Sequence, residues 1–179
     1  VLATQNPIEM EGTYLLPEAQ IDRFLLKIDI PYPSAEVLDA ILELTTGSEV
    51  PAPQQVLTPV DILELQVLTR DVPIAAHVRQ AVVRFVLATQ PDSEEASKDV
   101  KRYVRFGVSP RGAQALVLAA KAHALLHGRY NVSFKDVRAM ILPALRHRFQ
   151  LNFEGEAEGV TAEDLLVQLY DRMVGHAGG

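Results

Sequence analysis

The sequence has 179 residues, of which 48% are hydrophobic and 6% aromatic, and its 17 basic and 23 acidic side chains give a formal net charge of −6. This composition excludes wholesale disorder, and the scarcity of aromatic residues favours helices over a β-sandwich. The absence of Cys excludes a disulfide framework and a thiolate metal site, which fits a cytoplasmic protein. The acidic balance argues against nucleic acid as the main partner. No apolar run approaches the ~20 residues of a membrane span, so we expect a soluble chain.

The first thirty residues predict a strand, a short helix and a second strand. Residues 1–4 have the character of a buried strand that Asn6-Pro7 stops, and Pro17 suits the first position of a helix to about Phe24. Residues 24–30 predict the second strand, which two prolines close. Because the chain starts with Val1 in an apparent mid-strand, we expect further residues upstream.

Every later element is predicted to be helical. The signals are Ser, Thr and Pro residues at helix starts, three of them with an acidic residue three positions on, as in a capping box. They place helices after Ser34, Thr58, Pro73, Ser109, Ser133 and Thr161, separated by a connector at 48–57 and a polar loop at 91–99. The fold class expected is therefore mainly α, with a strand–helix–strand remnant of an α/β layer in front of a helical bundle.

Three short segments carry polar residues with possible chemistry, and the first is Ala3-Thr4-Gln5-Asn6-Pro7. Polar residues at the end of a strand lie at the sheet edge where open α/β folds bind ligands. The amide of Asn6 both donates and accepts, so it suits a water and a phosphate oxygen together. The same residues also suit a simple turn, and their spacing leaves both interpretations open.

The second segment is GTYLLPEAQIDRF, residues 12–24, in which Arg23 ends a short helix just before a strand. On position alone, Arg23 either compensates the helix C-terminus or pairs with Glu18 or Asp22.

The third segment is Gly107-Val108-Ser109-Pro110-Arg111-Gly112. With Ser109 as the cap, Arg111 falls in the first helical turn, which is the unfavourable end for a cation. The same end presents free N–H groups to anions, and a guanidinium beside them suits a phosphate. An arginine that is merely tolerated there is the alternative.

Together these segments resemble the MoxR family of AAA+ ATPases over residues 1 to about 150. ATQNP is similar to the family's sensor 1 segment, GTYLLPEAQIDRF to its arginine-finger segment and GVSPRGAQAL to its sensor 2 helix; residues 128–137 and Leu145-Arg146-His147-Arg148 resemble the end of its lid. Met10 and Leu15 depart from the pattern at positions without chemistry. The resemblance implies that residues 1–32 end an αβα P-loop NTPase core and that residues 33–179 form a helical lid domain.

The resemblance also implies roles for three residues. Asn6 would be sensor 1 and would orient the attacking water near the γ-phosphate. Arg23 would be the arginine finger that reaches into a neighbouring subunit's site. Arg111 would be sensor 2 and would contact the nucleotide from the lid. The implied cofactors are ATP and Mg²⁺, and the implied partners are further subunits in a ring, expected to be hexameric, and client proteins, including proteins with von Willebrand A domains.

Two further patterns do not support a metal site. His123 and His127 have a metal-ligand spacing, but residue 124 is Ala rather than the Glu of H-E-x-x-H, so packing is the preferred interpretation. An acidic run, Glu154, Glu156 and Glu158, is interpreted as a solvated loop rather than a calcium site.

The sequence contains neither G-x-x-x-x-G-K-[ST] nor an apolar strand that ends in Asp-Glu, so the main phosphate and Mg²⁺ ligands are absent from these 179 residues. We therefore expect the isolated chain to be inactive and the full-length protein to be an ATPase. The alternatives are a magnesium-chelatase-like or helicase-like AAA+ motor subunit, and a helical adaptor that binds protein but no nucleotide.

Overall fold

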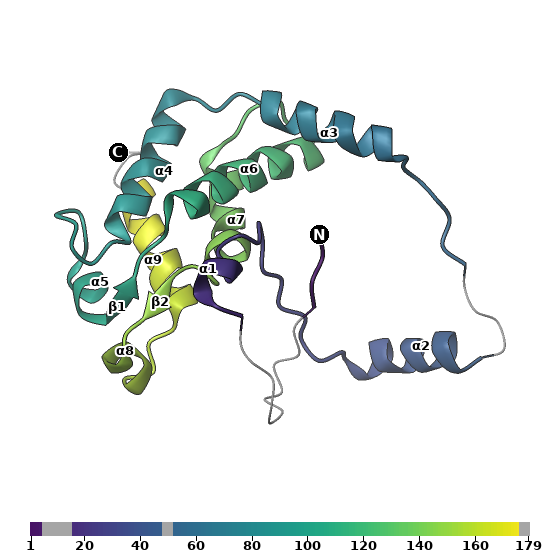
Figure 1. Ribbon diagram of the computed structural model, residues 1–179, viewed down its shortest axis with the longest axis horizontal. Helices are drawn as coiled ribbons and strands as arrows, with labels where there is room; N and C mark the ends of the chain where they lie inside the picture. Colours follow the sequence, from purple (N-terminus) through teal and green to yellow (C-terminus); the bar gives the residue numbers. More distant parts are fainter. Residues whose placement is uncertain (5–15, 48–51, 176–179) are drawn as a thin grey trace.

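A computed structural model describes residues 1–4, 16–47 and 52–175 (Figure 1). Helices dominate, which confirms the predicted fold class. In chain order the elements are α1 (Glu18–Ile21), α2 (Ala35–Thr46), α3 (Pro59–Asp71), α4 (Ala76–Ala88), α5 (Lys98–Tyr103), β1 (Val104–Phe106), α6 (Pro110–Leu126), α7 (Phe134–Leu145), β2 (Gln150–Leu151), α8 (Phe153–Ala157) and α9 (Ala162–Gly175).

The hydrophobic core lies among α4, α6, α7 and α9. Helix α6 packs along α7, α7 packs against α9, and α4 contacts both α6 and α9. Large apolar side chains from all four helices are completely buried there, namely Phe85, Leu116, Ile141, Leu145 and Leu166. Burial of such residues supplies the main stabilisation of the bundle, about 1.5–3 kcal/mol for each large side chain.

Five of the six predicted helix starts are confirmed, whereas the helix expected to open at Pro73 begins at Ala76, with Ala75 as its N-cap and no side-chain cap. Ser34, Ser109 and the Thr58 capping box each accept a hydrogen bond from a backbone N–H of the first turn. Ser133 and Asp136 form the second capping box. Asp164 donates its backbone N–H to the Thr161 hydroxyl over 3.1 Å at the start of α9.

The two strands predicted near the N-terminus are not formed in the described residues. Residues 1–4 and 26–30 have no regular structure, and α1 ends at Ile21 rather than near Phe24. A strand needs a neighbouring strand to pair its N–H and C=O groups, and no described segment pairs with these residues as a strand. Residues 22–29 run instead along the C-terminal end of α7, where Lys27 N–H donates to Pro143 C=O over 2.8 Å.

A two-stranded antiparallel sheet, β1 with β2, and the short helices α5 and α8 were not expected from the sequence. The acidic run predicted as a solvated loop starts in α8, which Asn152 caps. Arg102 on α5 explains the arrangement, because its guanidinium contacts Glu154 at 2.7 Å and Glu158 at 2.6 Å. The segment is therefore partly helical rather than a loop, while its three glutamates remain exposed, as expected.

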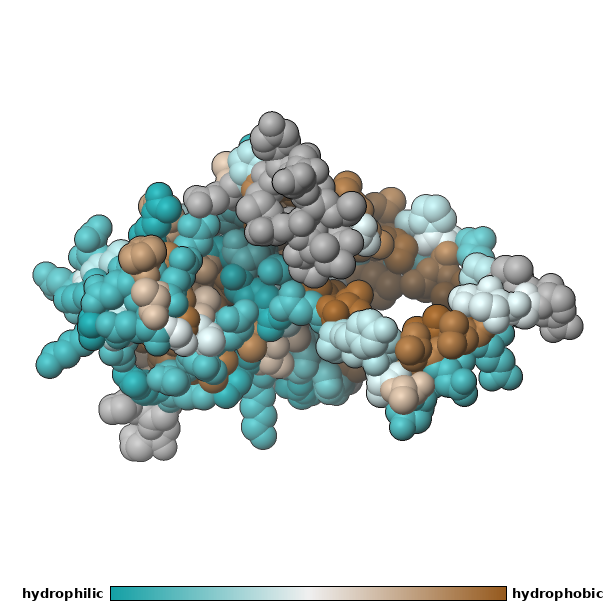
Figure 2. Space-filling model, turned by 90° about the horizontal axis from the view of Figure 1, so that it is seen from below, coloured by the Kyte–Doolittle hydropathy of each residue, from teal (hydrophilic) through white to brown (hydrophobic). Residues whose placement is uncertain are grey.

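Helices α2 and α3 differ from the bundle, because no residue of either is buried among the described residues. Their exposed apolar side chains include Ile41, Leu42, Leu44, Leu63 and Val67. Figure 2 shows hydrophobic residues gathered at the end of the molecule where α2 and α3 lie. Within the described part of the chain, no helix is both long and apolar enough to cross a membrane.

Candidate functional site

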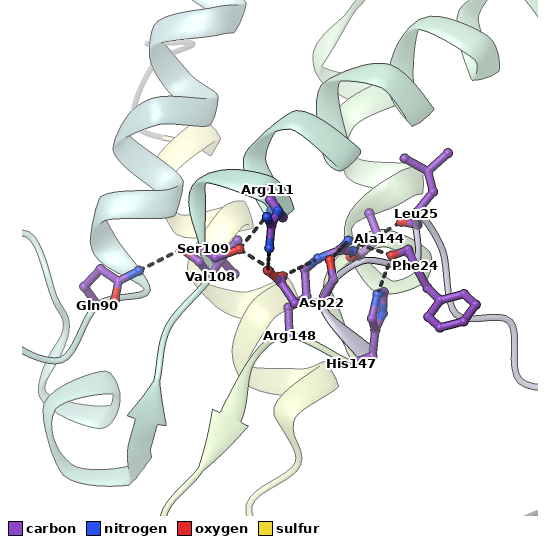
Figure 3. Close-up of polar contacts among 11 residues, drawn as sticks. Asp22, Phe24, Leu25, Gln90, Val108, Ser109, Arg111, Ala144, His147 and Arg148 are labelled. Atoms are coloured by element: carbon purple, nitrogen blue, oxygen red, sulfur yellow. Dashed lines mark hydrogen bonds and ion pairs between the residues drawn. The ribbon is translucent and has the colours of Figure 1, made fainter. Parts of the chain in front are cut away.

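The segment with Arg23 and the helix start with Arg111 meet at one carboxylate, that of Asp22 (Figure 3). Asp22 follows α1, and its side chain is 22% exposed. Asn6, the third predicted site residue, lies outside the described residues. The structure therefore brings together the surroundings of two of the three predicted residues, although they are 88 positions apart in the sequence.

In this structure the Asp22 carboxylate lies beside the N-terminus of α6. Ser109 caps the helix by accepting the Gly112 N–H at 3.2 Å, and its hydroxyl donates to Asp22 Oδ1 at 2.9 Å. Arg111 Nη1 lies 3.8 Å from Asp22 Oδ2, and the Arg111 side chain is 58% exposed. Such a loose, exposed ion pair contributes little stability, about 0–1 kcal/mol, so Arg111 can leave Asp22 at small cost.

The segment that leads into α6 is held by residues at the C-terminal end of α4. Gln90 Nε2 donates to Val108 C=O over 2.8 Å, and Val108 N–H donates to Thr89 Oγ1 over 3.0 Å. Gly107 passes so close to α4 that a Cβ there would lie 2.4 Å from the Thr89 carbonyl oxygen. The side chains of Thr89 and Gln90 therefore hold the backbone just before Ser109 and Arg111 in place.

Arg148, just beyond the end of α7, holds the other side of Asp22. Its Nε donates to Asp22 Oδ1 at 3.0 Å, and its Nη2 donates to Asp22 C=O at 2.8 Å and to Phe24 C=O at 2.6 Å. The side chain is only 3% exposed. Burial lowers the pKa of Arg148 and the Asp22 carboxylate opposes this effect, so the guanidinium stays charged at neutral pH.

The residues on either side of Arg148 extend this contact. His147 Nε2 lies 3.0 Å from Phe24 C=O, which can only accept, so Nε2 carries the proton. Arg146 pairs with Asp29. The sequence Arg146-His147-Arg148, given above only as part of a resemblance, thus binds residues 22–29 at several points along their length.

The Arg23 side chain is exposed and makes no hydrogen bond or ion pair with the described part of the chain. Its neighbour Asp22, which was one of its expected partners, is instead engaged by Arg148, Ser109 and Arg111. A cation with a fixed backbone and a free side chain is suited to bind an anion from another molecule.

A second charged cluster lies inside the bundle and surrounds Asp136, which is completely buried. Arg129 donates to both carboxylate oxygens at 2.6 and 2.5 Å, and Ser133 and His123 bind the same carboxylate at 2.6 and 2.7 Å. Burial raises the pKa of Asp136, but the hydrogen bonds outweigh it and hold the pKa well below its usual range. His127 binds the His123 carbonyl group at 2.8 Å. Across the described ranges, no three His, Cys, Asp or Glu side chains are grouped as metal ligands.

Comparison with known families matches both parts of the chain. The AAA lid domain matches residues 96–169, and the ATPase family associated with various cellular activities (AAA) matches residues 1–26. A putative ATPase of known structure from Cytophaga hutchinsonii superposes with a TM-score of 0.85 at 32% identity, over 92% of this chain and 50% of that one. The fold and the site thus define the chain as an AAA+ ATPase sequence.

Curated relatives indicate to which family of AAA+ ATPases the chain belongs. The chain is 41% identical over 163 residues to Chaperone MoxR1 of Mycobacterium tuberculosis, covering 91% of this chain and 43% of the relative. It is 35% identical over 166 residues to Protein MoxR of Paracoccus denitrificans, covering 85% and 48%. The chain belongs to the MoxR family of AAA+ ATPases, and it spans about half the length of the curated relatives that it matches.

Proposed function

We propose that this chain supplies the residues that complete an ATP site between adjacent subunits of a ring. In this proposal residues 1–32 end the ATPase core, residues 33–179 form the lid, and Arg23 is the arginine finger for the neighbouring subunit. The observation that carries the proposal is the exposed Arg23 side chain, which has no polar partner among the described residues and stands on a backbone that Arg148 holds. A guanidinium presented in this way stabilises charge that develops on a transferred phosphoryl group.

Arg111 is proposed to contact the nucleotide from the lid as sensor 2. At the N-terminus of α6 beside Arg111, the Ser109 hydroxyl already donates to the Asp22 carboxylate. The same groups are therefore suited to bind a phosphate oxygen. Asn6 is proposed as sensor 1 on the strength of the sequence alone.

The whole protein is proposed to hydrolyse ATP with Mg²⁺ and to use this reaction to remodel client proteins or insert cofactors into them. The name Chaperone MoxR1 of one relative supports a protein client, and the sequence resemblance favours clients with von Willebrand A domains and a hexameric ring. The main phosphate and Mg²⁺ ligands are absent from these 179 residues. The isolated chain should therefore be inactive, and calorimetric titration should detect no micromolar binding of Mg·ATP.

The first test compares Arg23→Ala with Arg111→Ala in the full-length protein. Arg23→Ala should leave ATP affinity nearly unchanged and lower turnover by about 10³–10⁵, the range known for arginine fingers. Arg111→Ala should weaken both affinity and turnover, because a lid contact also acts on the ground state. Normal turnover in Arg23→Ala would show that Arg23 is not a finger.

Mixed rings test whether Arg23 acts across a subunit boundary. An Arg23→Ala subunit keeps its own phosphate loop, and a subunit mutated in that loop keeps its finger. Mixing two nearly inactive parents should therefore restore partial activity at interfaces with both parts intact. If no mixture regains activity and Arg23→Ala binds ATP as poorly as a phosphate-loop variant, Arg23 is a structural residue and the finger assignment is wrong.

A further inference from the structure

We infer that Arg148 is a positioning residue for the arginine finger: its guanidinium fixes the backbone on both sides of Arg23, so that the Arg23 side chain points in one direction. This inference rests on the proposed role of Arg23. It assigns to a lid residue a part in catalysis at the neighbouring subunit, although Arg148 itself touches no nucleotide in this proposal.

The contacts of Arg148 surround residue 23. The guanidinium binds the carbonyl group of Asp22 before Arg23, and the carbonyl groups of Phe24 and Leu25 after it, at 2.8, 2.6 and 3.2 Å. A fourth bond goes to the Ala144 carbonyl group at the end of α7. One planar cation thus ties three backbone positions of the finger segment to the bundle (Figure 3).

The Asp22 carboxylate connects this anchor to the start of α6. Its Oδ1 accepts from both Arg148 Nε at 3.0 Å and Ser109 Oγ at 2.9 Å, while Oδ2 faces Arg111. The finger segment and the proposed phosphate contact are therefore fixed by one shared group. A shift of the lid helix α6 would move the backbone of Arg23 with it.

Space for the Arg148 side chain depends on Gly112 in the first turn of α6. A Cβ at position 112 would lie 3.0 Å from Arg148 Cδ and 2.5 Å from Val108 Cγ1. The absence of a side chain there lets the guanidinium pass α6 and reach Asp22 in its buried position.

The arrangement favours a geometric role over a purely stabilising one. A buried charge loses hydration, and this cost offsets most of what its ion pair contributes to stability. What the charge fixes instead is direction, because five N–H donors in one plane define the positions of their acceptors. Arginine fingers are sensitive to such placement, since a displacement of about 1 Å costs about 10²-fold in rate.

The test uses Arg148→Lys in the full-length ATPase. Lysine keeps the positive charge but cannot bind three carbonyl groups and a carboxylate in one plane. Turnover at saturating ATP should fall about 10²-fold, while nucleotide affinity and the unfolding temperature stay close to wild type. Arg138→Lys is the matched control, because Arg138 lies on α7 and pairs with Asp171 at the surface; its turnover should not change.

Asp22→Asn is the second variant and decides the matter if Arg148→Lys does not fold. It keeps the size of the side chain but removes the charge shared by Arg148 and Ser109, so turnover should fall again with affinity retained. If the folded variants keep full turnover while Arg23→Ala is inactive, the inference about Arg148 is wrong and the finger assignment survives. If Arg23→Ala is itself active, both fail.

Mixed rings separate positioning from a structural role. Arg148→Lys subunits should regain activity when mixed with phosphate-loop variants, because their own nucleotide sites are intact. They should regain none when mixed with Arg23→Ala subunits, because both lack a working finger. Recovery in the second mixture would overturn the inference.

Discussion

The molecule contains two buried arginine–aspartate clusters that use the same chemistry for different ends. Around Asp136, the partners Arg129, Ser133 and His123 all lie within 13 residues in the sequence, at the end of α6 and in the connection that leads to α7. Around Arg148, the Asp22 partner lies 126 residues away and belongs to a segment outside the bundle. The Asp136 cluster caps the N-terminus of α7, and the Arg148 cluster attaches residues 22–29 to the bundle.

The two clusters show that the effect of losing a buried charge depends on which segments that charge connects. The Asp136 carboxylate is completely buried and all its bonds stay within the bundle, so its loss should be felt as lost stability. The Asp22 carboxylate is 22% exposed, and of residues 22–29 only the partly buried Leu26 packs against the hydrophobic core. Replacement of Asp22 should therefore displace Arg23 more than it lowers stability.

The largest difference in stability should appear between Asp136→Asn and Asp22→Asn in this chain. Asp136→Asn leaves the Arg129 guanidinium without its carboxylate in a buried site and should lower the free energy of unfolding by about 3 kcal/mol. Asp22→Asn weakens a more exposed contact and should lower it by about 1 kcal/mol or less. Urea denaturation measures both values, and equal losses would contradict the distinction between the clusters.

Gly112→Ala should have an intermediate effect, because the added methyl group meets Val108 and the Arg148 side chain. Overpacking of this kind costs about 1–3 kcal/mol. Thermal unfolding measures the loss, with Gly128→Asn as a comparison: Gly128 has φ of 67° and open space around its Cβ position, a conformation that Asn tolerates. A Gly112→Ala protein as stable as wild type would show that Arg148 is not tightly enclosed.

The smallest effect concerns pH and His147. Burial lowers the pKa of His147, helped by the nearby charges of Arg148 and Lys27 and opposed by Asp22 and the bond to Phe24. The unfolded chain therefore binds more protons once the pH falls below about 6.5, and stability drops with pH there, by at most about 1.4 kcal/mol per pH unit from this group.

His147→Gln isolates this contribution, since the Gln amide can still donate to Phe24 C=O but does not titrate. The buried Nδ1 of His147 has no hydrogen-bond partner among the described residues, so a proton added there would have no acceptor and the charged imidazolium is disfavoured. Urea denaturation between pH 7 and 5 should show a shallower decline for the variant than for wild type. Identical declines would mean that His147 is freely hydrated in the fold.

The sequence predicted the capping box within the local cluster, although not the contacts of Arg129 and His123, and it predicted nothing of the distant cluster. Ser133 and Asp136 stand three residues apart before an apolar helix, a spacing that specifies a capping box without tertiary information. By contrast, the contact between Asp22 and Arg148 depends on how residues 22–29 lie on α7, which no short-range pattern encodes. From the sequence, Asp22 was expected only as a partner for Arg23, and no function was expected for Arg148.

The two N-terminal strands were predicted wrongly for a related reason. Residues 24–30 have the apolar character of a strand, but strand formation depends on a neighbour, whereas the helices depend mainly on their own caps and apolar faces. Residues 154–158 were predicted as a loop but begin in the short helix α8, which Asn152 caps and which Arg102 on α5 contacts through Glu154 and Glu158.

The most direct test of the account is amide hydrogen exchange across residues 22–29 in this chain. The Lys27 amide donates to Pro143 C=O, and the Arg23 and Phe24 amides donate to carbonyl groups of α1. We expect all three to be protected in wild type, and to exchange at least about tenfold faster in Arg148→Lys while the core of α6 and α7 is unchanged. Exchange in wild type as fast as in a free peptide, or equal protection in Arg148→Lys, would contradict the claim that Arg148 holds the finger segment.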